Sequence, residues 1–276
     1  MRVLAKDVAA HSGKNVQIQG WLHKKRLLGG LTFIVVRDRT GLTQVVVQDK
    51  DEVEKLRGMQ IGTVLTVEGK ANSEPRAPGG AELHDPNITI IVPVTDEPLI
   101  EIDKPLSHRP DNLDTLFEYR PIGLRNMQET AIFKVRSAIS RALREFFYEN
   151  DFTEVQTPKL LAAATEGGAE VFKLDYFGKE ATLAQSPQFY KQMLVGVFER
   201  VFEIAPVYRA ELSATTRHMS EYTSVDAELG FIALHDLQKI LSDLMNYVVE
   251  YVWKHCEGQL KDRKSTRLNS SHGYIS

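Results

Sequence analysis

The spacing of the apolar residues changes once along the chain, and this change constrains the fold more than any other feature. Up to about residue 100 the apolar side chains alternate in short runs, which is the pattern of β-strands. From Glu129 onward they recur every three or four residues, as in an amphipathic helix. With 276 residues the chain has room for two domains of ordinary size. The sequence therefore predicts an all-β domain followed by one that mixes helices and strands.

Five short runs in the first hundred residues have the composition of strands, and turn residues separate them. A short helical segment falls between the third run and the fourth. Five strands with this one helix are typical of the OB-fold barrel, which often binds single-stranded nucleic acid. We therefore expect an OB-fold over residues 1–100. The expected strands and helix are Asn15–Leu22, Leu31–Arg37, Leu42–Val47, Asp51–Met59 (the helix), Thr63–Gly69 and Asn87–Val94.

The rest of the chain divides into a connector, a second domain and a tail. Residues 101–128 contain several Pro and Asp residues and are expected to form a linker. Residues 129–261 join helices and strands through loops, without a strand–helix alternation or a glycine-rich phosphate loop. We expect an α+β fold there, with an antiparallel sheet flanked by helices. Residues 262–276 lack periodicity, and we expect this tail to be an artefact that does not continue the fold.

A predicted hairpin at residues 202–231 concentrates charged side chains. Alternate residues of its second strand point to opposite faces, so one face is apolar and the other carries carboxylates. Arg209 follows the first strand, and Arg217 and His218 lie in the loop. Such a hairpin suits a polyanionic ligand that also bears an amine, although a solvated hairpin without function has the same composition. The apolar face carries Val225, Ala227, Leu229 and Phe231, and the polar face carries Ser224, Asp226 and Glu228.

The net charge of −3 gives no bulk positive field, so any contact with RNA must come from a local patch. One basic cluster runs from His23 to Arg26 in the first domain, with Phe33 on the next strand and Gln44 on the one after. Basic side chains beside an aromatic ring can hold phosphates and stack an unpaired base. The alternative is a solvated basic face with Phe33 in the barrel core.

The location of the protein is predicted from two further features. The single cysteine, Cys256, excludes an internal disulfide and a cysteine-based metal site. The N-terminus lacks an apolar signal core, and no apolar run approaches the roughly 18 residues of a membrane span. We therefore expect a cytoplasmic protein that does not contact a membrane.

Five stretches together resemble one family, and they occur in the family's order. They are GWLHKKR with FIVVRDRTGLTQVVVQ, FTEVQTP, ATEGGAEVF, LAQSPQFYKQM, and RAELSATTRHMSEY followed by TSVDAELGF. The first resembles an anticodon-binding OB domain, the second and last resemble motifs 1 and 2, and the others resemble a mobile loop and an amino-acid-pocket helix. The chain up to about residue 260 thus resembles the class II aminoacyl-tRNA synthetases of subclass IIb, in their archaeal aspartyl group.

The resemblance implies that ATP and L-aspartate form aspartyl-adenylate and that the aspartyl group then passes to tRNA. Arg209 matches the catalytic arginine that binds the substrate carboxylate and the α-phosphate. Glu211 matches a residue that reads adenine or the tRNA end, and Arg217 and His218 match loop residues near the β- and γ-phosphates. Tyr222 stands where the family has a phenylalanine that stacks on adenine. The implied cofactors are ATP and Mg²⁺.

The same resemblance implies an aspartate pocket. Glu166, Ser186, Gln188 and Asp226 match the ligands of the substrate ammonium. Lys191 matches the residue that faces the side-chain carboxylate, and an ammonium group favours that carboxylate over the neutral amide of asparagine. The alternative for Lys191 is a solvated helix lysine. Asparaginyl-tRNA synthetase, which shares the motif 2 pattern, is the alternative function within the family.

The remaining matches concern tRNA and a second subunit. Phe33 matches the residue that stacks on the middle anticodon base, and Gln44 and Arg26 match its hydrogen-bonding partners. His23 fits the relaxed enzymes that also charge asparagine tRNA. Pro158 matches a motif 1 proline at a homodimer interface. The implied partners are therefore tRNA, L-aspartate and a second copy of the chain.

The chain departs from the family at its C-terminal end. The third motif of class II synthetases, the acidic residues that hold magnesium and a second aspartate-binding arginine have no counterpart. We therefore expect the 276-residue chain to be an inactive fragment with no metal site of its own. An RNA-binding synthetase-like protein without catalysis remains an alternative from another class. A synthetase-like asparagine synthetase is disfavoured, because it lacks the domain at residues 1–100.

Overall fold

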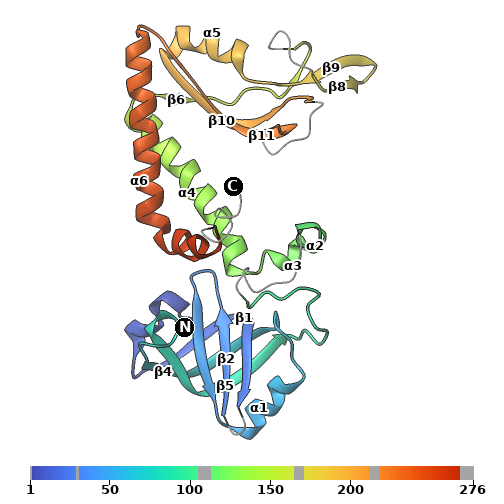
Figure 1. Cartoon of the computed structure of the whole chain (residues 1–276), viewed down its shortest axis with the longest axis vertical. Coiled ribbons are helices and arrows are strands. Elements are labelled where there is room, and N and C mark those ends of the chain that lie inside the picture. Colours follow the sequence, from blue (N-terminus) through green and yellow to red (C-terminus); the bar gives the residue numbers. More distant parts are fainter. Residues whose placement is uncertain (1, 29–30, 105–112, 165–170, 212–217, 268–276) are drawn as a thin grey trace, which may run out of the picture. The chain divides into compact units, whose positions relative to one another are not determined.

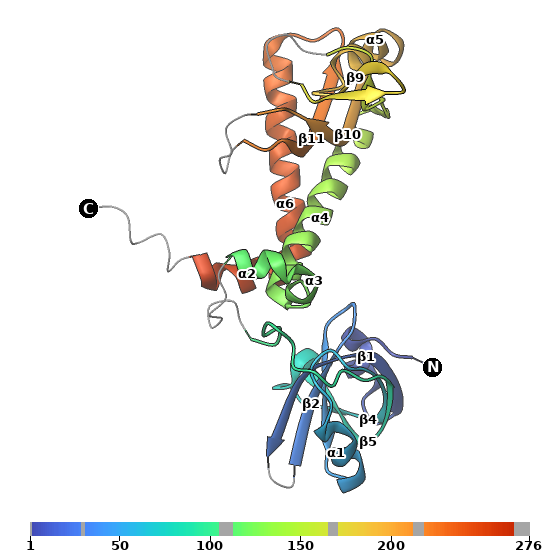
Figure 2. The same ribbon diagram turned by 90° about the vertical axis from the view of Figure 1, so that its right-hand side faces the viewer.

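The structure is a computed structural model of the chain, and it describes residues 2–28, 31–104, 113–164, 171–211 and 218–267. The chain forms two compact units, one comprising residues 1–130 and the other residues 131–267 (Figures 1 and 2). Each unit is described by itself.

The first unit contains the expected OB-fold, a closed five-stranded barrel in the order β1-β2-β3-β5-β4. The helix α1 (Lys50–Arg57) lies between β3 and β4, as predicted, and two 3₁₀ helices span Ala5–His11 and Pro78–Gly80. The strands are β1 (Asn15–Leu28), β2 (Leu31–Arg37), β3 (Leu42–Val47), β4 (Val64–Ser73) and β5 (Ala81–Val92).

Three strands of the barrel, β1, β4 and β5, are longer than the sequence predicts. β1 runs six residues past Leu22, because the residues beyond it still pair with β2. β5 begins at Ala81, six residues before the predicted start at Asn87. The strand passes through Asp85 and Pro86, with Asp85 at φ 48°, next to a register shift in the pairing with β4. A bulge absorbs the irregular residues without ending the strand.

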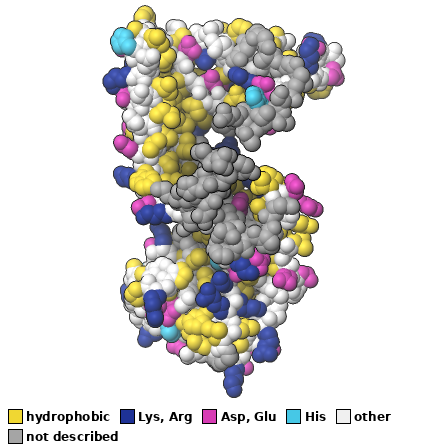
Figure 3. Space-filling model, in the orientation of Figure 1, with side chains coloured by type: hydrophobic (Ala, Val, Ile, Leu, Met, Phe, Trp, Pro, Cys, Tyr) yellow, Lys and Arg dark blue, Asp and Glu magenta, His cyan; other side chains and the backbone are white. Residues whose placement is uncertain are grey.

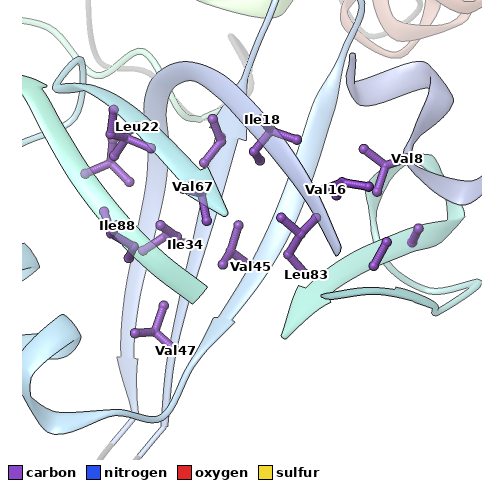
Figure 4. Close-up of a cluster of buried hydrophobic side chains, with 14 of the residues drawn as sticks. Val8, Val16, Ile18, Leu22, Ile34, Val45, Val47, Val67, Leu83 and Ile88 are labelled. Carbon is purple, nitrogen blue, oxygen red and sulfur yellow. The ribbon is translucent and has the colours of Figure 1, made fainter. Parts of the chain in front are cut away.

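The barrel encloses one apolar core, to which every strand contributes inward-facing residues. Figure 4 shows side chains such as Ile34, Val45 and Val67 pointing toward one another in the interior. The alternation of buried and exposed positions along β2 places Ile34 and Val36 inside and Phe33 outside. The predicted alternative, Phe33 as a core residue, is therefore wrong.

The described residues of the predicted linker belong to the first unit, and side-chain contacts hold them in place. It contains α2 (Leu113–Glu118) and α3 (Arg120–Gly123). Asn126 is buried, and its Nδ2 donates to the carbonyls of Ile102 (3.1 Å) and Lys104 (2.8 Å). Its Oδ1 accepts from the backbone N–H of Gln128 at 2.9 Å. One buried amide thus fixes both ends of the connector.

The second unit contains the predicted hairpin, β10 paired with β11 in antiparallel register. β6 adds to β10 in parallel, and β7, β9 and β8 form a separate small sheet. No helix among the described residues is long and apolar enough to cross a membrane. The elements are α4 (Met127–Glu149), β6 (Thr153–Glu154), β7 (Leu160–Leu161), β8 (Lys173–Tyr176), β9 (Lys179–Leu183), α5 (Gln188–Phe198), β10 (Arg200–Tyr208), β11 (Glu221–Leu229) and α6 (Leu234–Arg267).

The two faces of the hairpin have different neighbours. α4 and α6 lie side by side and cover the apolar face, where Phe146 and Leu244 pack around Phe202 (Figures 1 and 2). The opposite face carries Glu203 and Asp226 as a directly paired couple. The parity predicted for the second strand is therefore present, and it separates a core face from a polar face.

One expectation about the C-terminal part is wrong. Phe231 was expected on the apolar face, but it lies beyond β11 with φ 55° and is 96% exposed. The helix α6 runs to Arg267, so its last residues overlap the expected tail at residues 262–276. A kink at Cys256 (φ −127°) interrupts the helix, and the residues that follow are mostly good helix formers, so the helix resumes.

Candidate functional site

A pocket of about 370 Å³ lies at the open end of the hairpin. Arg209, Glu211, His218, Met219 and Tyr222 line it, so four of the five predicted ATP ligands are brought together. The fifth, Arg217, lies outside the described residues. Arg209 follows β10 and its N–H bonds the carbonyl of Ser220 at 2.9 Å, which keeps it in register with β11.

The residues of this pocket fit a nucleotide. A guanidinium binds phosphate oxygens in a forked geometry, and the half-buried ring of Tyr222 offers a face to a base. Strand parity places Arg209 and Tyr222 on the same face as Asp226. Asp226 is four residues from Tyr222, which corresponds to about 13 Å along the strand. The polar face therefore combines a nucleotide pocket with a second polar group at a distance that a small ligand can bridge.

That second polar group centres on Lys191 of α5. Its Nζ donates to Asp226 Oδ1 at 3.3 Å and lies 3.6 Å from Glu228 Oε2. Ser224 Oγ donates to the other oxygen of Asp226 at 2.5 Å. The Lys191 and Asp226 side chains are only 15% and 18% exposed. Lys191 is thus a partly buried cation on the polar face, and the solvated helix lysine considered above is wrong.

The helix α5 begins at Gln188, directly after Ser186 and Pro187. Ser186 is buried, and its Oγ accepts a hydrogen bond from the N–H of Gln188 at 3.2 Å. The hydroxyl therefore still satisfies one N–H at the helix start. Glu166, the remaining predicted aspartate ligand, lies outside the described residues.

A buried carboxylate connects the polar face to the segment around Pro158. Glu203 is 3% exposed, and its oxygens accept from the Thr157 N–H (2.6 Å), the Thr157 hydroxyl (2.9 and 3.1 Å) and Lys159 Nζ (2.6 Å). Pro158 itself is exposed. Glu203 thus holds both residues that flank the exposed proline. No motif points to Glu203, although its pairing with Asp226 across the hairpin places it on the polar face.

The predicted anticodon residues meet on the outer face of the barrel. Residues directly opposite in neighbouring strands share a face, so β1, β2 and β3 form three rows of outward side chains. This outer face comprises Arg26, Phe33 and Val46 in the first row, Lys24, Val35 and Gln44 in the second, and Trp21, Arg37 and Leu42 in the third.

A pocket of about 340 Å³ opens on this outer face. All four predicted anticodon residues line it: His23, Arg26, Phe33 and Gln44. The partly buried ring of Phe33 forms a flat apolar surface beside the exposed Arg26, which is the arrangement that stacks an unpaired base. The lining residues that the sequence analysis did not identify as ligands are Lys24, Val35, Leu42, Arg76, Pro78 and Asp103.

His23 lines this pocket from a bulge in β1. The pairing register shifts between Leu22 and Lys24, which leaves His23 as the extra residue. Its ring is 7% exposed, and Nδ1 has no hydrogen-bond partner among the described residues. Burial, followed by the positive charge of Arg37, lowers the pKa of His23 to about 4, and Asp103 opposes this shift. The imidazole is therefore neutral at physiological pH and free to accept or donate one hydrogen bond.

A neighbouring pair of residues fixes the amide of Gln44. Glu82 accepts from Gln44 Nε2 at 2.7 Å, and its other oxygen lies 2.8 Å from His84 Nε2. Because the amide nitrogen is held by Glu82, the amide oxygen is left to face other partners. The spacing of Gln44 and Glu82 in sequence gave no signal for this contact, which arises from the short parallel pairing of β3 with β5.

Lys25 does not take the role that the basic cluster suggested. Its Nζ donates to the carbonyls of Leu56 (2.9 Å), Arg57 (3.2 Å) and Met59 (2.7 Å) at the end of α1. Burial lowers its pKa. A cation at a helix C-terminus satisfies orphan carbonyls and complements the helix dipole. Lys25 is thus a structural cap, and its neighbours Lys24 and Arg26 remain on the outer face.

Within the described ranges, no three His, Cys, Asp or Glu side chains gather closely enough to hold a metal ion.

Two family models match the chain. The model of tRNA synthetases class II (D, K and N) matches residues 112–272, and that of the OB-fold nucleic acid binding domain matches residues 16–91. The first match therefore covers more than half of the chain and both polar sites of the hairpin, and the second covers the outer face of the barrel.

Several known proteins are similar to the chain over most of its length. The aspartate–tRNA(Asp/Asn) ligase of Methanocorpusculum labreanum is 44% identical over 262 residues, which are 93% of this chain and 60% of that protein. The aspartate–tRNA(Asp) ligase of Pyrococcus horikoshii is 43% identical over 261 residues, 91% and 58% of the two chains. A crystal structure of asparaginyl-tRNA synthetase from Pyrococcus horikoshii with asparaginyl-adenylate superposes with a TM-score of 0.86 at 31% identity, covering 95% and 60%. The chain spans about three fifths of the length of these relatives.

Proposed function

The chain belongs to the class II tRNA synthetases of the D, K and N group, and from this premise we propose that the whole protein is an aspartate–tRNA ligase. It activates L-aspartate with ATP and transfers the aspartyl group to tRNA. The observation that carries the choice of amino acid is the partly buried Lys191, placed between Asp226 and Glu228 on the face that leads to the nucleotide pocket.

The ion pair between Lys191 and Asp226 supplies both halves of an aspartate site. In the proposed complex the substrate ammonium takes the place of the Lys191 ammonium at Asp226, and the substrate side-chain carboxylate replaces Asp226 at Lys191. Two ion pairs then form where one existed. Asparagine can make only the first of them, because its neutral amide cannot form an ion pair with the mostly buried ammonium of Lys191.

Arg209 acts on the reacting groups. The α-carboxylate of aspartate attacks the α-phosphorus of ATP, an acyl phosphate bond forms, and pyrophosphate leaves. A guanidinium on the polar face neutralises the carboxylate and the α-phosphate and holds them in line. Tyr222 stacks on the adenine ring, and Glu211, Arg217 and His218 contact the ends of the nucleotide. In the second step a hydroxyl at the 3′ end of tRNA attacks the acyl carbon and AMP leaves.

The proposal extends to the tRNA and to the assembly. The outer face of the barrel stacks an anticodon base on Phe33, and Arg26, Gln44 and His23 contact the loop. The neutral His23 fits a relaxed enzyme that charges asparagine tRNA as well. The exposed Pro158 contacts a second copy of the chain. Mg²⁺ accompanies ATP, and a cytoplasmic location remains part of the prediction.

Aspartate-dependent exchange of pyrophosphate into ATP, measured on the full-length protein, tests the proposed activity. We expect exchange with aspartate and at least 100-fold less with asparagine. Lys191→Met removes the cation and should lower kcat/KM for aspartate by at least two orders of magnitude, equivalent to about 3 kcal/mol. Lys239→Met is the matched control, because Lys239 is an exposed helix lysine paired with Asp243. Faster exchange with asparagine than with aspartate would refute the assignment.

A second candidate, an asparagine–tRNA ligase, is favoured by one observation, the TM-score of 0.86 to the asparaginyl-tRNA synthetase of Pyrococcus horikoshii. The exchange experiment separates the two activities directly. If asparagine is the substrate, Lys191→Met should leave its exchange rate intact or raise it.

A further inference from the structure

We propose that Arg37 and Arg125 form a binding site for a phosphodiester of the RNA backbone, a few nucleotides away from the base that stacks on Phe33. The inference rests on the proposed RNA binding by the barrel and adds a second contact to it.

Arg37 is the first member of this site. It ends β2 in the third row of the outer face, and its Cζ lies 5.0 Å from the ring centroid of its cross-strand partner Trp21. Its Nε is buried and has no hydrogen-bond partner among the described residues. The indole thus holds the guanidinium by a cation–π contact while its donors remain available. A buried donor without a partner costs free energy, which a ligand oxygen would recover.

Arg125 brings a second positive charge close to the first. It follows α3 and is exposed, and its Nη1 lies 3.3 Å from where a Cβ on Gly62 would be. The Gly62 N–H donates to the carbonyl of Leu22 at 2.7 Å, and Leu22 pairs with the residue that precedes Arg37 on β2. Burial and then the charge of Arg125 lower the pKa of Arg37. Among the described residues no carboxylate forms an ion pair with either arginine; the nearby Asp103 acts instead on His23. Two like charges without a counter-ion repel each other, and an anion between them removes that repulsion.

The position of the pair favours a phosphodiester of RNA as this anion. Phe33, Val35 and Arg37 point outward from alternate positions of β2, so Arg37 is about 13 Å from Phe33 along the strand. Lys24, in the row between them, continues the positive charge. A few nucleotides of single-stranded RNA span that length, with a base on the ring at one end and a phosphate at the other. The forked donors of arginine match phosphate oxygens in two-point contacts.

The experiment measures binding of an anticodon stem-loop RNA to the chain by fluorescence anisotropy across a series of KCl concentrations. Two loops are used, one with the aspartate anticodon and one with all three anticodon bases changed. The variants are Arg37→Gln, Arg125→Gln and Phe33→Ala. Arg57→Gln is the matched control, because Arg57 is an exposed arginine of the same unit that pairs with Glu54 on α1.

We expect Arg125→Gln and Arg37→Gln each to weaken binding of both loops five- to tenfold near 100 mM KCl. Each should also reduce the slope of log K against log salt by about 0.7 to 0.9, the loss of one phosphate contact. Phe33→Ala should weaken the aspartate loop more than the changed loop and leave the slope as it was. Arg125→Gln should not lower the melting temperature, because it removes a repulsion, whereas loss of a structural arginine would lower it.

The outcomes separate this inference from the proposed function. One outcome would overturn the phosphate site and leave the proposed function standing. In it, RNA binding depends on sequence and on Phe33, but Arg37→Gln and Arg125→Gln leave the slope of log K against log salt unchanged. No binding of either loop by the unsubstituted chain would overturn both. Because Arg125 is exposed, its variant decides the question even if Arg37→Gln fails to fold.

Discussion

A single extra residue in β1 determines the chemistry of His23. Without the bulge, strict alternation along the strand would place this side chain opposite the buried Leu22, on the outer face. The bulge turns it into a confined position where Arg37 lies close by. Burial and the positive charge of Arg37 both favour the neutral imidazole. A basic cluster in the sequence therefore contains one member that carries no charge at neutral pH, and composition alone could not reveal it.

The stability of the barrel should depend on pH through His23. The folded state holds its pKa at about 4, while the unfolded chain has the ordinary value near 6.5. The unfolded state therefore binds the proton first as pH falls. The free energy of unfolding should be unaffected above pH 6.5 and should fall by about 1.4 kcal/mol per unit down to about pH 4, roughly 3 kcal/mol in total.

Urea titrations at several pH values between 7 and 4, on the chain and on His23→Gln, measure this contribution. Carboxylates titrate in both proteins, so the difference between the two stability curves isolates the histidine. The two curves should converge toward pH 4. Parallel curves over this range would show that His23 is protonated in the folded protein as readily as in the unfolded one.

At the scale of elements, Glu203 joins β10 to the segment that leads into β7. Its carboxylate accepts from Thr157 and Lys159 and holds both sides of Pro158. Replacement of Glu203 by Leu would leave the largely buried Lys159 ammonium and the Thr157 N–H without their acceptor. Breaking a buried ion pair in this way costs about 3–5 kcal/mol.

We therefore expect Glu203→Leu to lower the free energy of unfolding of the second unit by about 3 kcal/mol or more, measured by urea denaturation. Glu203→Gln keeps an acceptor for the N–H and should lose less. Glu180→Leu serves as the control, because Glu180 pairs with Lys173 but is 65% exposed. Equal losses at Glu203 and Glu180 would show that burial of the carboxylate contributes nothing.

Most elements and both predicted pockets follow from period, parity and the order of motifs. The hairpin faces are an example: Asp226 and Tyr222 share a parity, and the structure places them on one face. The errors arise where tertiary contacts override local signals. Lys25 belongs to a basic run, but it caps a helix about thirty residues away. Gln44 is oriented by Glu82 through a strand pairing that no local sequence signal predicts.

The exposed apolar side chains of the long helix α6 also lie beyond what periodicity predicts. Its periodicity predicts an amphipathic helix, and Leu244 and Ile240 do pack on the core. A second stripe at four-residue spacing is 43 to 62% exposed, and Figure 3 shows hydrophobic side chains gathered along this helix. Periodicity identifies apolar positions but not which of them a neighbour covers. The stripe consists of Leu237, Leu241, Met245, Val249 and Trp253.

At the scale of the whole molecule, the two units have separate apolar cores. The core of the barrel draws on residues 3–88, and the core around Phe202 draws on residues 143–248. The first unit also includes part of the connector, since Asn126 bonds the carbonyls of Ile102 and Lys104. A polypeptide of residues 1–130 therefore contains a closed sheet, a complete core and both ends of that connection.

We expect residues 1–130 to fold alone with one cooperative thermal transition, because their barrel has no open sheet edge and buries its core without the second unit. Residues 1–104 should also fold but be less stable by about 3 kcal/mol in urea. Ile100 and Ile102 are buried in the chain, and Gly123, which packs against Ile100, would be absent. Asn126→Ala in the longer fragment is the matched variant and should lose part of the same stability. Equal stability of the two fragments would mean that the connector only spans the units, whereas the expected difference would make the connector part of the first unit.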